Sequence, residues 1–169
     1  MWRDRRKAGS GLLLLVSIII LVIVGLFREE ADPDRFGPYS VERIVDGDTF
    51  IAIIDGKSEK IRLLGVDAPE SVHPDQRRNT EKGEEVSEYV RSLLKNKRVY
   101  LEYDVSMADQ YDRVLAYVYL EDGKTMLNEL LLEEGYAAVM TVQPNNRYTD
   151  HFYELQKKAQ EEKKGIWEN

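Results

Sequence analysis

The fold of this chain is organised around the stretch Arg62-Leu63-Leu64-Gly65-Val66-Asp67-Ala68-Pro69-Glu70. It begins as a strand, because successive residues alternate between two faces and Ile61 shares a face with Leu63. The strand pattern ends at Pro69, since proline has no N–H for a β-ladder and restricts the residue before it. The stretch therefore brings the guanidinium of Arg62 and two carboxylates close to one edge of a sheet.

These charged groups suit the hydrolysis of a phosphodiester. One carboxylate can hold a hard cation, the other can act on water, and the guanidinium can neutralise phosphate charge. Charged side chains at the end of a strand are also commonly no more than a solvated surface. The remainder of the chain has to distinguish these two interpretations.

The first 27 residues have the composition of a membrane anchor. Residues 1–7 contain Arg3, Arg5, Arg6 and Lys7 against one acid, and Ala8 to Phe27 is a run of 20 residues without charge. A helix of that length spans about 30 Å, the thickness of a bilayer core. We expect an uncleaved transmembrane signal anchor in residues 8–27. A cleaved signal peptide is the alternative, but the apolar run is long and no A-x-A-like site follows it.

The basic flank predicts a single-pass protein with a cytoplasmic N-terminus and residues 28–169 outside the cytoplasm. Residues 28–38 are polar and contain two prolines, so we expect a short stalk there. Residues 39–169, roughly 130 in number, are enough for one folded domain with a single core. The chain has no cysteine, which excludes disulfides and thiolate metal sites.

The charge of the exported part restricts how it could bind nucleic acid. The chain has 24 basic and 31 acidic residues, of which residues 1–27 contain four and one. Residues 28–169 are left with 20 and 30, a net charge of −10. Such a domain repels a polyanion. A nucleic-acid substrate would therefore have to be bound through a local basic patch or a metal ion.

Alternation and turn signals predict five strands, at residues 39–45, 49–54, about 59 into the opening stretch, 98–103 and 114–120. Amphipathic patterns predict three helices, at residues 84–95, about 125–134 and about 149–164. Gly135 is expected just after the second helix and Thr149 at the N-cap of the third. The order predicts an α+β class: a five-stranded OB-fold-type β-barrel with three α-helices, preceded by one N-terminal transmembrane helix.

Several motifs, in this order and spacing, resemble the staphylococcal nuclease (thermonuclease) family. They are Asp46-Gly47-Asp48-Thr49, the opening stretch, Asp109-Gln110-Tyr111-Asp112-Arg113, Pro144-Asn145-Asn146 and Gly165-Ile166-Trp167. The resemblance covers about residues 39–168. It implies a calcium-dependent phosphodiesterase on an OB-fold barrel, which cuts DNA and RNA to leave 3′-phosphate ends. No sequence feature indicates an obligate protein partner.

The resemblance also implies a calcium site. Asp48 and Asp67 match the family's calcium-binding carboxylates, and the backbone carbonyl of Ala68 matches a third protein ligand. Asp46 would give outer-shell support. Two carboxylates, a carbonyl and water molecules suit Ca²⁺, which prefers hard oxygen ligands.

Four further residues match the family's catalytic and substrate-binding positions. Glu70 would act as the general base on the attacking water, which requires a carboxylate beside that water. Arg62 and Arg113 would grip the scissile phosphate with planar guanidiniums. Tyr111 would hydrogen-bond a substrate phosphate.

The chain departs from the family pattern at four positions. Ala68 replaces a threonine and Gln110 replaces a basic residue, which removes a hydroxyl contact and a phosphate contact. Met140 and Val142 stand where some members have tyrosines that stack on a nucleotide base, so base stacking is expected to be weaker. A non-catalytic nucleic-acid- or protein-binding OB-fold module is the alternative, although such a module has no need of the charged set.

Overall fold

The computed structural model describes residues 32–71 and 80–168, and residues from Pro33 onward belong to one compact unit. The predicted transmembrane segment at residues 8–27 lies outside the described residues and stays a prediction. Within the described ranges, no helix is both long enough and apolar enough to cross a membrane.

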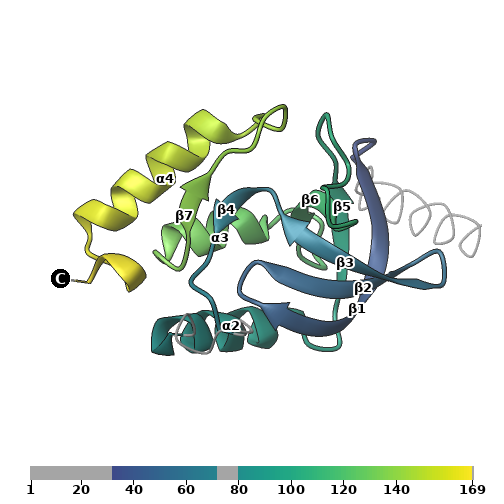
Figure 1. The fold of residues 1–169 in the computed structure, drawn as a ribbon, viewed down its shortest axis with the longest axis horizontal. Helices are drawn as coiled ribbons and strands as arrows, with labels where there is room; N and C mark the ends of the chain where they lie inside the picture. Colours follow the sequence, from purple (N-terminus) through teal and green to yellow (C-terminus); the bar gives the residue numbers. More distant parts are fainter. Residues whose placement is uncertain (1–31, 72–79, 169) are drawn as a thin grey trace, which may run out of the picture. The chain divides into compact units, whose positions relative to one another are not determined.

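In the described residues, five strands close into a barrel in the order β1–β2–β3–β6–β5 (Figure 1). They are β1 (Arg35–Asp46), β2 (Thr49–Ile54), β3 (Lys57–Leu63), β5 (Arg98–Glu102) and β6 (Val114–Tyr119). Neighbours pair antiparallel except β3 and β6, which are parallel with Ile61 opposite Val114. The predicted five-stranded barrel is confirmed.

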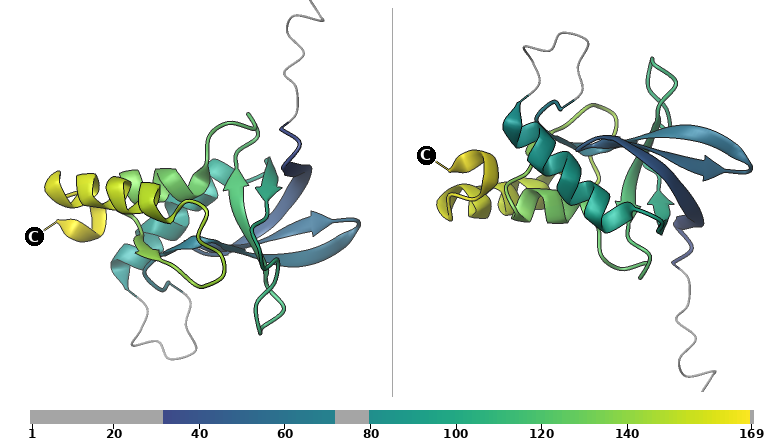
Figure 2. Two further views of the ribbon diagram at one scale, coloured as in Figure 1. Left: turned by 90° about the horizontal axis from the view of Figure 1, so that it is seen from above. Right: turned by 90° about the horizontal axis from the view of Figure 1, so that it is seen from below.

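The three predicted helices are present, with shifted ends. They are α2 (Glu81–Leu94), α3 (Leu127–Glu133) and α4 (Thr149–Glu161), followed by a 3₁₀ turn, η2 (Gly165–Trp167). α2 contacts β1, whereas α3 contacts both α4 and β6 (Figure 2). α2 begins earlier than expected because Thr80 caps it, its Oγ accepting the N–H of Gly83 at 2.9 Å. The predicted N-cap at Thr149 is wrong, since Tyr148 holds that position without a side-chain bond.

The predicted stalk is too long at its C-terminal end. It was expected to reach residue 38, but β1 begins at Arg35. Phe36 pairs with Leu101 and Tyr39 pairs with Val99 on β5, with a register shift between the two pairs. A proline is tolerated at such an irregularity in a strand. Pro38 is therefore part of the barrel and does not mark a linker.

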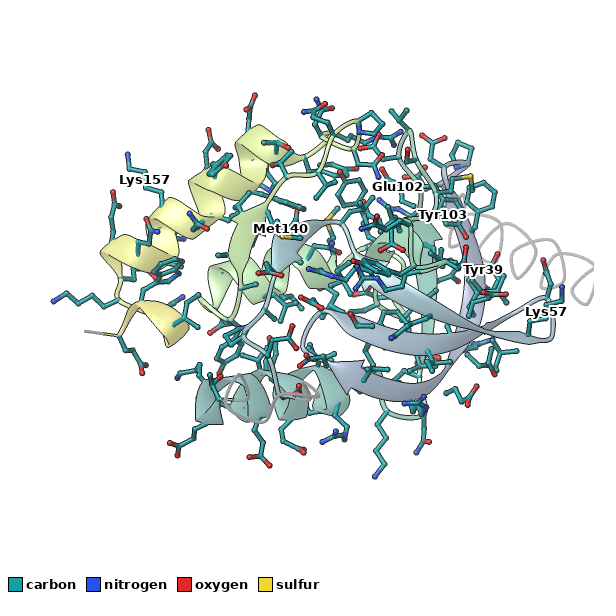
Figure 3. The ribbon with its side chains drawn as sticks, in the orientation of Figure 1. Tyr39, Lys57, Glu102, Tyr103, Met140 and Lys157 are labelled. Atoms are coloured by element: carbon teal, nitrogen blue, oxygen red, sulfur yellow. The ribbon has the colours of Figure 1, made fainter. Side chains whose placement is uncertain are left out.

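The opening stretch also differs from its prediction, because it does not continue as one strand. β3 ends at Leu63, and β4 (Gly65–Asp67) pairs antiparallel with β7 (Ala138–Met140) in a separate two-stranded sheet. Gly65 has a φ of +76°, in the left-handed region that favours glycine. The chain therefore turns out of the barrel at Gly65, which lies opposite Met140 (Figure 3).

A buried amide joins the barrel to the helices. Asn128 on α3 is fully buried; its Oδ1 accepts the N–H of Val118 at 3.0 Å and its Nδ2 donates to the carbonyl of Leu64 at 2.8 Å. These bonds satisfy a backbone donor of β6 and an acceptor at the point where β3 ends. Burial without such partners would be unfavourable.

A buried carboxylate joins the barrel to the loop before α4. Glu102 lies at the end of β5 (Figure 3). It is only 3% exposed. One of its oxygens accepts the hydroxyl of Tyr119 at 2.7 Å. The other accepts the hydroxyl of Tyr148 at 2.9 Å and Nη1 of Arg147 at 2.7 Å. Three donors therefore compensate for the burial of this charge.

Three more bonds along the segment that follows β5 hold that loop. Asp104 accepts the backbone N–H of Arg147 at 3.1 Å. Asn145 exchanges two bonds with the backbone of Ser106, at 2.7 and 2.8 Å. Residues 102 and 104 through their side chains, and residue 106 through its backbone, thus each hold a part of residues 145–148.

Replacing Glu102 by Gln should destabilise the fold. An amide has only one acceptor oxygen and adds two donors, so it cannot accept all three bonds and leaves the charge of Arg147 without its partner. We expect the free energy of unfolding to fall by about 2–4 kcal/mol, measured by urea denaturation. Glu121→Gln is the matched control, because Glu121 is on the surface with Lys97 and Arg98 at 3.5 Å and should change stability by less than about 1 kcal/mol. Equal effects of the two substitutions would contradict the role given to Glu102.

Candidate active site

A buried guanidinium joins two of the predicted carboxylates. Arg62, on β3, is 6% exposed. Its Nη2 lies 2.9 Å from an oxygen of Asp67, at the end of β4, and 3.1 Å from an oxygen of Asp48, in the turn between β1 and β2. Three predicted site residues, which come from two separate motifs, are therefore joined through Arg62.

The second terminal nitrogen of Arg62 binds the backbone at the bend. Nη1 donates to the carbonyls of Leu63 at 2.9 Å and Val66 at 2.7 Å. The bend at Gly65 lies between these two acceptors. One side chain therefore stabilises the turn that carries Asp67 out of the barrel and also contacts Asp67 itself.

Asp48 is 8% exposed, and its surroundings shift the pKa of its carboxyl in opposite directions. Burial raises the pKa of Asp48, while Arg62, the N–H of Ala68 at 3.0 Å and the hydroxyl of Thr49 at 2.9 Å lower it, and the net shift is upward. The bond from Ala68 places the backbone of that residue beside Asp48. A cation next to this carboxylate would favour its charged form.

The residues present fit a hard cation such as Ca²⁺. Oxygens of Asp48 and Asp67 both lie near one nitrogen of Arg62, and the side chain of Asp67 is 55% exposed and open to solvent. Ca²⁺ takes six to eight oxygen ligands, many of them water. In residues 32–71 and 80–168 no group of three or more acidic or histidine side chains could hold a metal. The fit therefore relies on two carboxylates, the nearby backbone and water.

The backbone around Glu70 is held by the N-terminus of α2 and by Asp46. The carbonyl of Glu70 accepts the N–H of Thr80 at 2.9 Å. A Cβ on Gly83 would lie 2.3 Å from that same carbonyl oxygen, so α2 packs directly on this backbone. Asp46 accepts the hydroxyl of Ser71 at 2.6 Å, and Ser71 follows Glu70 directly.

Sequence reasoning missed these supports of Glu70. Ser87 on α2 completes the group, 2.8 Å from the Ser71 hydroxyl and 3.2 Å from Asp46. Asp46 was expected to support the ion, and in the structure its oxygen accepts the two serine hydroxyls and backbone N–H groups. The only local signal was Thr80 followed by Glu81 and Glu84, since an N-cap threonine with acidic residues in the first turn is typical of a helix N-terminus.

The second predicted guanidinium, Arg113, lies at the same pocket as Arg62. The pocket has a volume of about 220 Å³. Tyr111 is 71% exposed at its rim, and the Arg113 guanidinium lies 5.6 Å from the centre of the Tyr111 ring. The lining includes Arg62, Arg113, Tyr111, Gln110, Met140 and Val142. Three of the four residues noted as departures from the family pattern, Gln110, Met140 and Val142, thus line this pocket, whereas Ala68 does not.

This arrangement can bind a phosphate group at two guanidiniums, with the carboxylates of Asp48 and Asp67 beside Arg62 for a cation. Comparison with known proteins points to a family of nucleases. The model of staphylococcal nuclease homologues matches residues 60–169, from β3 through the remainder of the chain. The chain belongs to the staphylococcal nuclease family.

Individual relatives extend the similarity to almost the whole chain. A thermonuclease of Staphylococcus hyicus is 39% identical over 174 residues, covering 97% of this chain and 99% of that protein. A thermonuclease of Staphylococcus intermedius is 38% identical over 172 residues, covering 96% and 99%. The endonuclease YncB of Bacillus subtilis is 38% identical over 130 residues, covering 76% of this chain and 60% of that protein.

Gly83→Ala should destabilise the protein although alanine is the better helix former. The new Cβ would meet the carbonyl of Glu70, which is backbone and cannot rotate away. We expect the free energy of unfolding to fall by about 1–3 kcal/mol, against the gain of about 1 kcal/mol that helix propensity alone predicts. Urea denaturation measures it. Ser92→Ala, at an exposed position of α2, is the control, and a stabilised Gly83→Ala variant would show that α2 does not fix the Glu70 segment.

Proposed function

We propose that this protein is a calcium-dependent nuclease that hydrolyses phosphodiester bonds of DNA, RNA or both and leaves 3′-phosphate ends. Membership of the staphylococcal nuclease family supports a nuclease hydrolase. The observation that carries the proposal is the contact of Arg62 with both Asp48 and Asp67, at the same pocket as Arg113. Calcium dependence and the product ends follow from the resemblance and from the oxygen-rich character of the site.

In this proposal, the substrate phosphate binds between Arg62 and Arg113. The guanidinium of Arg113 can donate two parallel bonds to a phosphate, whereas Arg62, whose two terminal nitrogens already have partners, would contribute chiefly its positive charge. During the reaction the phosphorus gains a fifth oxygen and the surrounding oxygens gain negative charge. Fixed cationic donors stabilise that state more than the bound substrate.

Glu70 is the proposed general base. It orients a water molecule and accepts its proton as the water oxygen bonds to phosphorus. The bond between phosphorus and the 5′ oxygen breaks, and the 5′ oxygen takes up a proton, so the products are a 3′-phosphate and a 5′-hydroxyl. Calcium held by Asp48, Asp67 and the carbonyl of Ala68 would supply positive charge beside the phosphate.

Calcium removal should abolish the activity. The test is digestion of single-stranded DNA by the full chain, solubilised in detergent, with calcium and then with a chelator. We expect cleavage only with calcium, and product ends that a 3′-phosphatase converts to 3′-hydroxyls. Activity that ignores the chelator would contradict the calcium mechanism, and no cleavage with any divalent cation would favour the non-catalytic binding module.

The substitution Glu70→Gln tests the proposed base in the same cleavage assay. It removes the proposed base while keeping the size of the side chain, so kcat should fall by about two to four orders of magnitude with the fold intact. Glu81→Gln is the matched control in the first turn of α2 and should leave kcat within about twofold.

We also propose that residues 8–27 anchor the protein in the membrane with the nuclease domain outside the cytoplasm. The basic flank of this segment supports that orientation. Calcium is plentiful outside the cell, which suits a site with only two side-chain carboxylates. The position would also keep the enzyme away from the cell's own nucleic acid.

Protease added to intact cells should therefore degrade the nuclease domain and leave a short membrane-bound fragment. Immunoblotting against the domain, with a cytoplasmic protein as the control that stays intact, measures it. A domain that is protected until the cells are lysed would reverse the orientation. Recovery of the domain in the culture medium would indicate a cleaved signal peptide.

A further inference from the structure

One carboxylate contacts Arg113 through both its side chain and its backbone. The Oδ2 atom of Asp109 lies 2.7 Å from Nε and 2.7 Å from Nη2 of Arg113. The Oδ1 atom of Asp109 accepts the backbone N–H groups of Tyr111 at 2.9 Å and Arg113 at 3.0 Å. The two oxygens therefore have separate tasks: one forms the turn and the other binds the guanidinium.

Backbone bonds make the turn a closed unit. The N–H of Asp109 donates to the carbonyl of Arg113 at 3.1 Å, and the N–H of Asp112 donates to the carbonyl of Asp109 at 3.2 Å. Asp112 has a φ of +58°, a conformation that Asp tolerates better than most residues. Val114 follows directly as the first residue of β6 and forms a bridge with Ala108. The turn is thus fixed to the barrel wall.

The orientation of Arg113 needs such a support. Its side chain is 27% exposed and has several rotatable bonds, so without a partner it would sample many rotamers. The contact with Asp109 uses the edge of the guanidinium that carries Nε. The edge that carries Nη1 and the outer proton of Nη2 is left for a phosphate, which can be bound there by two parallel bonds.

The carboxylate is charged at neutral pH. Partial burial raises the pKa of Asp109, but the backbone N–H groups of Arg113 and Tyr111 and the guanidinium lower it more, and the net shift is downward. A negative oxygen therefore faces the guanidinium throughout the physiological range. The side chain of Asp109 is itself 18% exposed, so little water competes for the contact.

We propose that Asp109 is a positioning residue for the phosphate-binding guanidinium of Arg113. It acts through Arg113 and does not touch the substrate. The proposal rests on the proposed nuclease function, because it assigns Asp109 a part in the rate of phosphodiester cleavage. It also makes a statement about the free protein, namely that the Nε–H of Arg113 is held by Asp109 before any substrate binds.

The kinetic test uses Asp109→Asn in the full chain. An amide has one acceptor oxygen, so it can keep the turn bonds or the guanidinium contact but not both. We expect kcat for single-stranded DNA to fall by about 10- to 100-fold, the loss typical of a catalytic group that is misplaced by about 1 Å. The Michaelis constant should change less, and the calcium concentration for half-maximal rate should be unchanged.

A double-mutant cycle separates positioning from a general structural effect. In an Arg113→Ala background, Asp109→Asn should lower kcat by no more than about twofold, because its route to the reaction has been removed. Asp112→Asn is the matched control, since it removes the same charge from the same exposed turn, and it should leave kcat within about twofold. An equal loss of kcat from Asp109→Asn in both backgrounds, or no loss in the wild type, would overturn the proposal.

An NMR measurement tests the contact between Asp109 and Arg113 independently of activity. The Nε–H of Arg113, assigned by its absence in Arg113→Ala, should give a slowly exchanging signal in the wild type and in Asp112→Asn. The signal should exchange much faster in Asp109→Asn. If the wild type cleaves nothing but this pattern holds, the nuclease proposal fails while the contact stands; if Nε–H exchanges freely in the wild type, Asp109 does not position Arg113 whatever the activity.

Discussion

The contact of Arg62 with Asp48 and Asp67 is the constraint on which the site depends. One nitrogen of this guanidinium joins two carboxylates, and the other binds the carbonyls on both sides of the bend at Gly65. A buried ion pair adds little net stability compared with apolar packing, but its orientation is well defined because its alternatives are unfavourable. Arg62 therefore fixes both the route of the chain out of the barrel and the relative positions of Asp48 and Asp67.

The local charge of the site bears on the proposed role of a cation. Three carboxylates, those of Asp48, Asp67 and Asp109, contact the two guanidiniums and outnumber them. Both guanidiniums already have acidic partners in the structure. A phosphate approaching such a site meets a net negative field. A doubly charged ion would more than offset this excess, so binding of the proposed cation would favour binding of a phosphate.

Much of the fold and the identity of the charged residues could be predicted from the sequence, since both depend on local patterns. The barrel strands alternate or follow turn signals, and the charged residues stand in contiguous motifs. The pairing of β4 with β7 could not be predicted, because each is only three residues long. The partners of Glu102 could not be predicted either, because Tyr119 and Tyr148 are 17 and 46 residues away along the chain. No periodicity predicts which hydroxyl reaches a buried carboxylate.

The way in which Met140 and Val142 are held at the pocket has an evolutionary consequence. Met140 is held by β4, and the loop after Val142 is held by the extension of β5 through Asn145 and Ser106. These attachments use backbone groups and residues other than the two side chains that face the pocket. Met140 and Val142 can therefore be exchanged for aromatic or polar residues without moving Arg62 or its carboxylates. Selection can therefore alter these two side chains of the pocket while the charged residues stay in place.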